Sequence, residues 1–239
     1  MKITVIGSSH GVPEPKRKCT SFLVEVGDKL YFIDMGTSGI DPLVNRGLRP
    51  EAVQAVFITH MHGDHTAGLI PFVDLLTWYF RTADPEIFLP SMDIAQALTG
   101  WLQVTTPPPL RPIRYRQVTE GEIFFDGTAR VTAFPTRHCP NAHAFLFEAE
   151  GKRILFAFDL KHPGTDFPRA EGPIDLLICE AAHFAATEYL PILEDREVKQ
   201  LAVTHYYEPF VPSVLQLKDA LARQGIPVTV AMDDMVFSL

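Results

Sequence analysis

Residues 59–65 read Thr59-His60-Met61-His62-Gly63-Asp64-His65, which places four metal-binding side chains within six positions. Histidines two residues apart extend to the same side of an extended or loop backbone, so His60 and His62 can converge on one ion. Asp64 and His65 then point in other directions. A solvated polar loop needs no such crowding of imidazole and carboxylate groups, whereas a metal ion makes it useful. The stretch therefore predicts a metal centre.

The sequence on either side of this cluster predicts its place in the fold. Before it stands Ala55-Val56-Phe57-Ile58, a short apolar run rich in β-forming residues, and after it an amphipathic segment continues to about Phe80. We therefore expect the cluster at the C-terminal end of a strand that leads into a helix. Open α/β sheets bind their ligands at that position.

Three later residues stand just beyond apolar, strand-like runs of their own. They are His138, Asp159 and His205, and the last of these repeats the strand-Thr-His ending seen at His60. A centre with two metal ions needs about six or seven ligands, so groups from later strand ends have to join the first four. We expect these three residues to complete the site.

Strand-like runs recur along the chain, and helical patterns separate some of them. The strand-like runs cover 2–6, 21–26, 30–33, 55–58, 86–89, 123–125, 129–134, 143–148, 153–157, 175–178, 200–203 and 227–230. The helical patterns cover about 66–80, 92–103, 185–195 and 212–224. Early β-hairpins followed by alternating strands and helices predict two mixed sheets covered by helices. The proline-rich segment 105–112 is expected to be a surface loop.

Length and cysteine content bound the fold class. The 239 residues suffice for one large domain or two fused half-domains, and no repeat, low-complexity tract or linker divides them. We therefore expect a single domain over 1–239. Cys19, Cys139 and Cys179 form no C-x-x-C pair, so neither a disulfide framework nor a thiolate zinc site is indicated.

Charge and hydropathy restrict the partners. No stretch of about 18 uncharged apolar residues occurs, and Met1 opens into a short strand-like run instead of a long apolar segment. The formal net charge of −8 disfavours general affinity for a polyanion. We expect a soluble, cytoplasmic protein that makes no membrane contact and acts on a small molecule, with nucleic acid disfavoured.

The motif H-x-H-x-D-H followed by a lone His, a lone Asp and a lone His resembles the metallo-β-lactamase superfamily, over essentially the whole chain. The resemblance implies an α/β fold, a four-layer αββα sandwich with the metals at the edge between two mixed sheets. Its implied ligands are His60, His62 and His138 for one metal, Asp64, His65 and His205 for the second, and Asp159 as the bridge. Asp34 matches an early aspartate that supports the site without binding metal.

Within the superfamily, the chain is similar to the ribonuclease Z-like phosphodiesterases. The likeness rests on the glycine turn at 7–13, on Pro15-Lys16-Arg17 and on the Glu-Ala pair within 177–181. That pair precedes a catalytic histidine in the branch, and here His183 follows Glu180 after three residues. The hypothesis is a carboxylate–imidazole pair that protonates a leaving oxygen. A structural histidine that caps the 185–195 helix is the alternative.

Two divalent ions about 3.5–4 Å apart would lower the pKa of a shared water toward about 7 and supply hydroxide. In this interpretation Asp64 binds a metal and orients the hydroxide, while Lys16 or Arg17 neutralises a substrate phosphate. His10 and His143 are further candidates for substrate contacts. Zinc is the first expectation for the metal, with manganese or iron as alternatives.

The favoured function is hydrolysis of a small or cyclic phosphodiester. The same site would also suit a carboxylic ester, lactone or thioester, with Phe72, Trp78, Tyr79 and Phe80 as candidates for an acyl pocket. Ribonuclease Z-type cleavage of tRNA 3′ ends is disfavoured, because the chain shows no long glycine- and proline-rich arm. The family resemblance alone implies a homodimer.

Other chemistries fit the sequence less well. The segment 7–11 formally matches G-x-S-x-G, but Pro13 and Pro15 follow it where a nucleophile elbow requires a helix. A metal-binding scaffold without activity is disfavoured because all seven ligand positions are present. A redox diiron role is disfavoured because relatives with that role usually carry a glutamate at the second histidine of the motif, and this chain has His62 there.

Overall fold

Both faces of most strands are apolar, and the faces alternate residue by residue, as the pleat of a strand requires. In β3 (Lys29–Met35), Tyr31 and Ile33 belong to one buried cluster, and Phe32 between them belongs to another. The same alternation divides β10 (Lys152–Ala157) between two clusters. A sheet that is apolar on both faces has to be covered on both. Two such sheets therefore require four layers.

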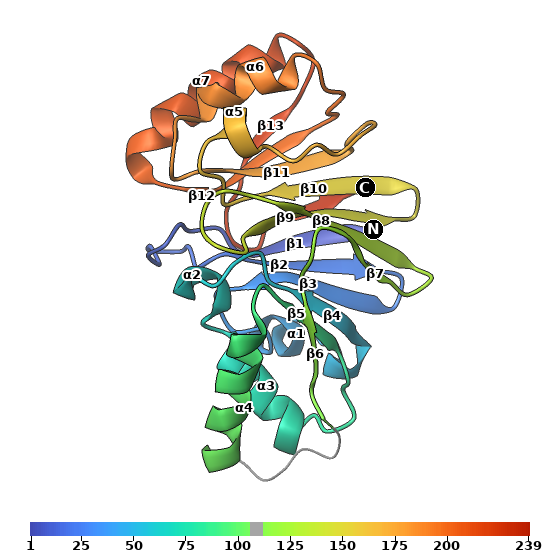
Figure 1. Cartoon of the computed structure of the whole chain (residues 1–239). Helices are drawn as coiled ribbons and strands as arrows, with labels where there is room; N and C mark the ends of the chain where they lie inside the picture. Colours follow the sequence, from blue (N-terminus) through green and yellow to red (C-terminus); the bar gives the residue numbers. More distant parts are fainter. Residues whose placement is uncertain (106–111) are drawn as a thin grey trace.

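The computed structural model describes residues 1–105 and 112–239. In Figure 1, α3 (Leu69–Trp78) and α4 (Met92–Thr105) cover one sheet, and α6 (Leu190–Leu193) and α7 (Val211–Ala222) cover the other. The two sheets pack face to face between these helices. The predicted αββα sandwich is confirmed.

The first sheet has the strand order β14-β1-β2-β3-β4-β5-β6. Besides β3, its strands are β1 (Lys2–Gly7), β2 (Ser21–Val26), β4 (Val53–Phe57), β5 (Glu86–Leu89), β6 (Arg114–Gln117) and β14 (Val236–Ser238). Pairing is antiparallel from β14 to β3 and parallel from β3 to β6. The parallel half needs crossover connections, and α3 and α4 lie in two of them.

The second sheet has the order β13-β12-β11-β10-β9-β8-β7. Besides β10, its strands are β7 (Gly121–Phe125), β8 (Ala129–Pro135), β9 (His143–Ala149), β11 (Leu176–Ala181), β12 (Leu201–Tyr206) and β13 (Val228–Val230). Pairing is parallel from β13 to β10 and antiparallel from β10 to β7. The remaining short elements are α1 (Asp41–Asn45), α2 (Gly63–Thr66), α5 (Pro163–Asp166) and the 3-10 turns η1 (Pro50–Ala52), η2 (Ala186–Tyr189) and η3 (Glu208–Phe210).

The two sheets meet at the edge where β4, β10, β11 and β12 end, and α2 lies at this edge in Figure 1. Backbone hydrogen bonds join the sheets there. The Thr59 carbonyl accepts from the His143 N–H at 2.9 Å, and the Ser8 carbonyl accepts from the His205 N–H at 3.0 Å. These bonds bring the strand ends of both sheets within side-chain reach of one another.

All twelve strand-like runs are strands, but the sequence analysis missed β6 and β14. Both lie at the outer edges of the first sheet. Edge strands pair on one side only, and these two expose most of their residues, so neither shows a continuous apolar pattern. Most of the expected 105–112 loop lies outside the described residues.

Two expected helices are broken. The helix expected at 66–80 is divided into α2 and α3 at Gly68, whose N–H bonds to the Met35 carbonyl at 2.8 Å and whose Cα packs against Thr37. The helix expected at 185–195 consists of η2 and the four-residue α6. No helix of the described residues is long and apolar enough to cross a membrane.

Candidate metal centre

The cluster that follows β4 turns its side chains toward the edge between the sheets. His60 lies in the loop after the strand, His62 immediately precedes α2, and Asp64 and His65 belong to the single turn of α2. A helical turn rotates successive residues by about 100°, so Asp64 and His65 face a different part of the edge from His60 and His62. The expected division of the motif is therefore present in the geometry.

A first group consists of His60, His62, His138 and Asp159, whose candidate ligand atoms lie within 4.8 Å of one another. The Nδ1 atom of His62 lies 3.0 Å from Nε2 of both His60 and His138. Asp159 Oδ2 lies 3.7 Å from the His60 nitrogen and 3.6 Å from the His138 nitrogen. Metal–nitrogen bonds of about 2 Å place tetrahedral ligands about 3.3 Å apart, so these separations suit one ion.

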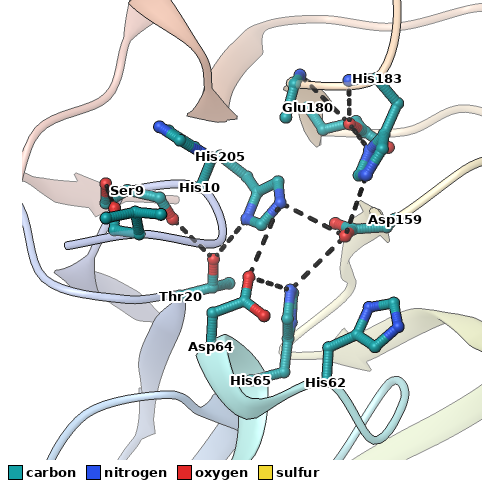
Figure 2. Close-up of polar contacts among 12 residues, drawn as sticks. Ser9, His10, Thr20, His62, Asp64, His65, Asp159, Glu180, His183 and His205 are labelled. Carbon is teal, nitrogen blue, oxygen red and sulfur yellow. Dashed lines mark hydrogen bonds and ion pairs between the residues drawn. The ribbon is translucent and has the colours of Figure 1, made fainter.

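A second group consists of Asp64, His65 and His205. His65 Nε2 lies 3.3 Å from Asp64 Oδ2, and His205 Nε2 lies 4.0 Å from the same oxygen. Asp159 Oδ2 is 3.6 Å from His65 Nε2 and 3.3 Å from His205 Nε2. Figure 2 shows the Asp159 carboxylate directed toward His205, His65 and His183. Asp159 thus contacts both groups, as a bridging ligand would.

Polar partners orient the His60 and His205 rings so that one nitrogen of each faces the centre. The Thr59 hydroxyl donates to Asp34 Oδ2 at 2.8 Å and can therefore accept from His60 Nδ1 at 3.0 Å. The Thr20 hydroxyl donates to the Ser9 carbonyl at 3.1 Å and can accept from His205 Nδ1 at 2.7 Å. With Nδ1 protonated in both rings, Nε2 carries the lone pair that a metal needs.

Two buried polar atoms at this place have no hydrogen-bond partner among the described residues, His65 Nε2 and Asp159 Oδ1. A buried polar atom without a partner costs free energy, and a cation between the two groups would satisfy both. Imidazole and carboxylate donors together suit zinc, manganese or iron. The residues present therefore fit divalent metal ions.

Electrostatics favour the ligand form of most of these groups. Burial and the charge of His65 lower the pKa of His60 to about 2, and burial lowers the pKa of His138 to about 4. Burial opposes ionisation of Asp64, but the nearby His65 imidazole, 3.3 Å away, lowers its pKa to about 2. Metal ligands have to be neutral imidazoles and ionised carboxylates, and these three already are near neutral pH.

His65 behaves differently. Burial disfavours its protonation, yet the charges of Asp34 and Asp159 raise its pKa well above the usual range. The imidazolium supplies positive charge between carboxylates. A divalent cation bound there would have to displace this proton.

Glu180 and His183 lie in contact beside the centre. Glu180 Oε2 lies 2.6 Å from His183 Nδ1, and its Oε1 accepts from the Leu160 N–H at 2.6 Å. Glu180 is fully buried, while His183 is partly exposed. Burial lowers the pKa of His183, but the hydrogen bond and charge of Glu180 outweigh it and raise that pKa to about 9. His183 therefore bonds to Glu180 and does not cap η2, which begins after Ala185.

Residues 32–206 match the family model described as "Beta-lactamase superfamily domain". The match covers more than half of the chain. The chain belongs to the metallo-β-lactamase superfamily.

Among curated proteins, ribonuclease Z from Leuconostoc mesenteroides is 30% identical over 170 residues, which are 69% of this chain and 50% of that protein. Ribonuclease BN from Cronobacter sakazakii is 27% identical over 169 residues, which are 69% of this chain and 55% of that protein. The chain thus spans about half the length of these relatives. Its sequence similarity is to proteins of the ribonuclease Z-like branch of the superfamily.

Solved structures share the fold. Human tRNase Z, short form, superposes with a TM-score of 0.75 at 21% identity, covering 100% of this chain and 99% of that chain. A diphosphatase of the PhnP family superposes with a TM-score of 0.68 at 20% identity, covering 100% and 97%. At such identities the likeness concerns the fold alone.

A cavity of about 260 Å³ opens beside the metal centre of this metallo-β-lactamase-fold chain. It is lined by His10, Gly11, His62, Asp64, Asp159, Ala182, His183, His205 and Tyr207. His10 and Tyr207 form one wall, with their ring centroids 4.9 Å apart. The sequence analysis named His10 for substrate contact but missed Tyr207, which no motif marks.

Three other residues expected at the substrate do not line this cavity. Arg17 is buried, and its guanidinium donates to the Ser8 carbonyl at 2.7 Å, pairs with Glu14 at 2.6 Å and lies 3.6 Å from the centre of the Tyr206 ring. The Arg17 charge is thus neutralised by Glu14 and does not face the cavity. Lys16 is exposed at the turn before Arg17. His143 is buried at the start of β9, and its Nδ1–H donates to the Asn141 carbonyl at 2.8 Å.

Proposed function

We propose that this chain is a metal-dependent hydrolase with two divalent ions, and that it cleaves a small or cyclic phosphodiester. The observation that supports this function most directly is the position of Asp159. Its carboxylate lies between the two ligand groups, and His183 Nε2 lies 4.0 Å from the same oxygen. A bridging ligand and a proton donor therefore face one small cavity.

The proposed ligands form two sets that share one residue. His60, His62, His138 and Asp159 would hold the first ion, and Asp64, His65 and His205, together with Asp159, would hold the second. When bound, such ions polarise a phosphoryl oxygen and lower the pKa of a water molecule toward about 7. The chain's own groups then have to orient that water and protonate the leaving oxygen.

Asp64 and His183 are suited to these two tasks. Asp64 is ionised and lies at the wall of the cavity, so its carboxylate can accept a hydrogen bond from the attacking water. Glu180 accepts from His183 Nδ1, which leaves the Nε2–H facing the cavity. His183 donates this proton to the leaving oxygen and becomes neutral. Its Nδ1–H remains on the ring, hydrogen-bonded to Glu180. Figure 2 shows Asp64 and His183 on different sides of Asp159.

The lining of the cavity favours a small substrate with a single phosphodiester charge. In the described part of the chain, no lysine or arginine lines it, so further phosphates would find no cation there. Its volume of about 260 Å³ is near the lower end for ligand pockets, which run from about 300 Å³ upward.

The lining also bears on the ester alternative. Phe72 is buried within α3, and Trp78 and Tyr79 are exposed at the end of that helix, so these residues do not line the cavity. Among the described residues, Tyr207 is the one large carbocyclic side chain of the lining. An acyl chain would find little apolar surface there.

Cleavage of RNA is a second candidate, because two exposed cations stand beside the ligands. Arg137 precedes His138, and Lys161 follows Asp159 by two residues. Among residues 1–105 and 112–239, neither side chain has a carboxylate oxygen within 4.0 Å. Both are available to flanking phosphates of a longer chain. The curated relatives named ribonuclease Z and ribonuclease BN point in the same direction.

The experiment compares three substrates with protein loaded separately with zinc and manganese. They are bis(p-nitrophenyl) phosphate, p-nitrophenyl acetate and an unstructured oligoribonucleotide. We expect metal-dependent cleavage of the first, abolished by His62→Ala and retained by His162→Ala, which changes an exposed histidine paired with Glu188. Turnover of the acetate alone would replace the proposal with an esterase, and turnover of RNA alone with a ribonuclease. Absence of turnover of all three substrates with either metal would refute the proposed hydrolase activity.

A further inference from the structure

Asp166, the last residue of α5, is a buried carboxylate whose partners are all uncharged. It is 8% exposed. Its Oδ2 accepts from the backbone N–H groups of Arg137 at 2.8 Å and Lys161 at 3.0 Å. Its Oδ1 accepts from the backbone N–H of His162 at 3.1 Å and the Thr165 hydroxyl at 3.3 Å. Within the described ranges no cation lies within 4.0 Å of it, so these four donors alone stabilise its charge.

One oxygen of this carboxylate joins the two loops that carry ligands of the first set. Arg137 immediately precedes His138 in the loop after β8, and Lys161 follows Asp159 by two residues in the loop after β10. Both N–H groups converge on Asp166 Oδ2. The bond to Arg137 spans 29 positions of sequence, so it joins segments that are distant along the chain.

A second hydrogen bond joins the same two loops. The Thr136 hydroxyl donates to the Asp159 carbonyl at 3.1 Å. His138 therefore follows two residues that are both attached to the segment around Asp159. The His138 ring, directly after these two residues, lies 3.6 Å from the Asp159 carboxylate.

A purely local role would not need this arrangement. The bonds from His162 and Thr165 to Oδ1 close the single turn of α5 and would do so without Oδ2. The second set has its own supports elsewhere, since Asp34 holds His65 and Thr20 holds His205. Loss of the Asp166 carboxylate should therefore displace His138, which belongs to the first set alone, and weaken the first ion more than the second.

We propose that Asp166 is a positioning residue of the metal centre, which holds His138 against Asp159 and thereby gives the first ligand set its affinity for metal. The inference rests on the metal centre of the proposed function, and it does not depend on which ester is cleaved. Residues that support metal ligands typically contribute about 10–100-fold to metal affinity.

The test is a metal titration of the full chain, stripped of metal and then competed against a chromophoric chelator with zinc. Wild-type protein is expected to bind two ions. Asp166→Asn keeps the size of the side chain but turns an amide N–H₂ toward backbone donors, so one ion should bind at least about 10-fold more weakly while the other stays within about 2-fold. Asp166→Ala should weaken the same ion further.

Asp126→Asn is the matched control. Asp126 likewise accepts four hydrogen bonds, from the Thr128 and Ala129 N–H groups, Lys29 and Tyr31. It lies far from the metal centre, because its partner Lys29 begins β3 and Asp34 lies near the end of that strand. Its replacement should lower thermal stability and leave both metal affinities unchanged. Thr136→Val, which removes the other attachment, should weaken the same ion as Asp166→Asn, whereas Thr136→Ser should not.

Several outcomes would overturn the inference. Asp166→Asn protein that is folded by circular dichroism and binds both ions as wild type does would make Asp166 a structural residue only. Equal weakening of both ions, or failure of both Asp166 variants to fold, would assign it to the stability of the chain. A wild-type chain that binds no metal would instead refute the metal centre itself. A wild-type chain that binds two ions without cleaving phosphodiesters would leave the role of Asp166 intact.

Discussion

His65 Nδ1 lies 2.6 Å from Asp34 Oδ2, and both side chains are fully buried. Asp34 also accepts from the Thr59 N–H at 2.7 Å and the Thr59 hydroxyl at 2.8 Å. One carboxylate therefore orients His65 directly and His60 through Thr59. The positive φ of 56° at Asp34 is unusual for a residue other than glycine, and the three contacts hold the backbone in it.

Asp34→Asn is expected to weaken metal binding by about 10–100-fold, because the amide cannot hold His65 in the tautomer that presents Nε2 to a metal. Zinc affinity by chelator competition checks this. Asp41→Asn, at the exposed start of α1, is the control and should bind zinc as wild type does. Wild-type affinity in the Asp34→Asn protein would contradict the supporting role of Asp34.

The metal-free chain should lose stability as pH rises from about 6.5 to 9. The folded-state pKa of His65 is raised by Asp34 and Asp159, and Glu180 raises that of His183 to about 9. A raised pKa contributes stability that is complete below the unfolded value, about 6.5, and lost as pH passes the folded value. Melting temperatures in EDTA at several pH values measure this loss.

The metal-loaded chain provides the comparison for that experiment. Its ligands are already deprotonated, so its melting temperature should fall less over the same range, and zinc binding should release protons. Proton release is measured by calorimetry in buffers of different ionisation enthalpy. A metal-free melting temperature that rises between pH 6.5 and 9 would contradict the assigned charge states of His65 and His183.

His183→Gln should reduce turnover according to the leaving group. With an alkoxide leaving group, loss of the proton donor should cost about 10²–10⁴-fold in kcat, while p-nitrophenolate leaves without a proton and should be affected far less. Rates on a dinucleoside phosphate and on bis(p-nitrophenyl) phosphate measure the difference. His162→Gln is the control. Equal losses on both substrates would argue against proton donation by His183.

Arg17→Met should destabilise the chain by about 2–4 kcal/mol, because it leaves Ser8 and Tyr206 carbonyls and Glu14 without their buried donor. The KM for a small phosphodiester should stay unchanged. Denaturant unfolding and steady-state kinetics check the two statements. The exposed Lys16→Met is the control for stability. A raised KM at unchanged stability would restore Arg17 as a substrate contact.

Gly36→Ala should lower stability by more than about 2 kcal/mol and weaken metal binding as well. A Cβ at Gly36 would lie 1.8 Å from the Asp64 carbonyl oxygen, so the turn of α2 that carries Asp64 and His65 would have to move. Gly63→Ala is the matched control, because nothing lies within 4 Å of the corresponding position. It should be neutral or slightly stabilising in unfolding measurements. Equal effects of the two changes would refute the close approach.

Some partners of the site could not be found from the sequence. Thr20 and His205 are 185 positions apart, and no motif links them. The role of Arg17 was expected at the substrate because its neighbourhood resembles a family loop, but its guanidinium turns inward onto Tyr206. Such contacts depend on how distant segments of the chain come together, and local sequence patterns do not predict this.

The sequence by itself determined the layers and the ligand candidates. Apolar residues on both faces of the strands require a covered sheet on each side. His60 and Asp159 follow strands, and His205 is the penultimate residue of β12; the C-terminal ends of these three strands meet at one edge. The tertiary structure alone decided which nitrogens of the His60 and His205 rings face the centre, and that Asp166 joins two ligand loops. The physical reason is the distance along the chain over which each kind of pattern acts. Periodicity and strand-end position act over a few residues, whereas hydrogen bonds between loops depend on how whole sheets pack.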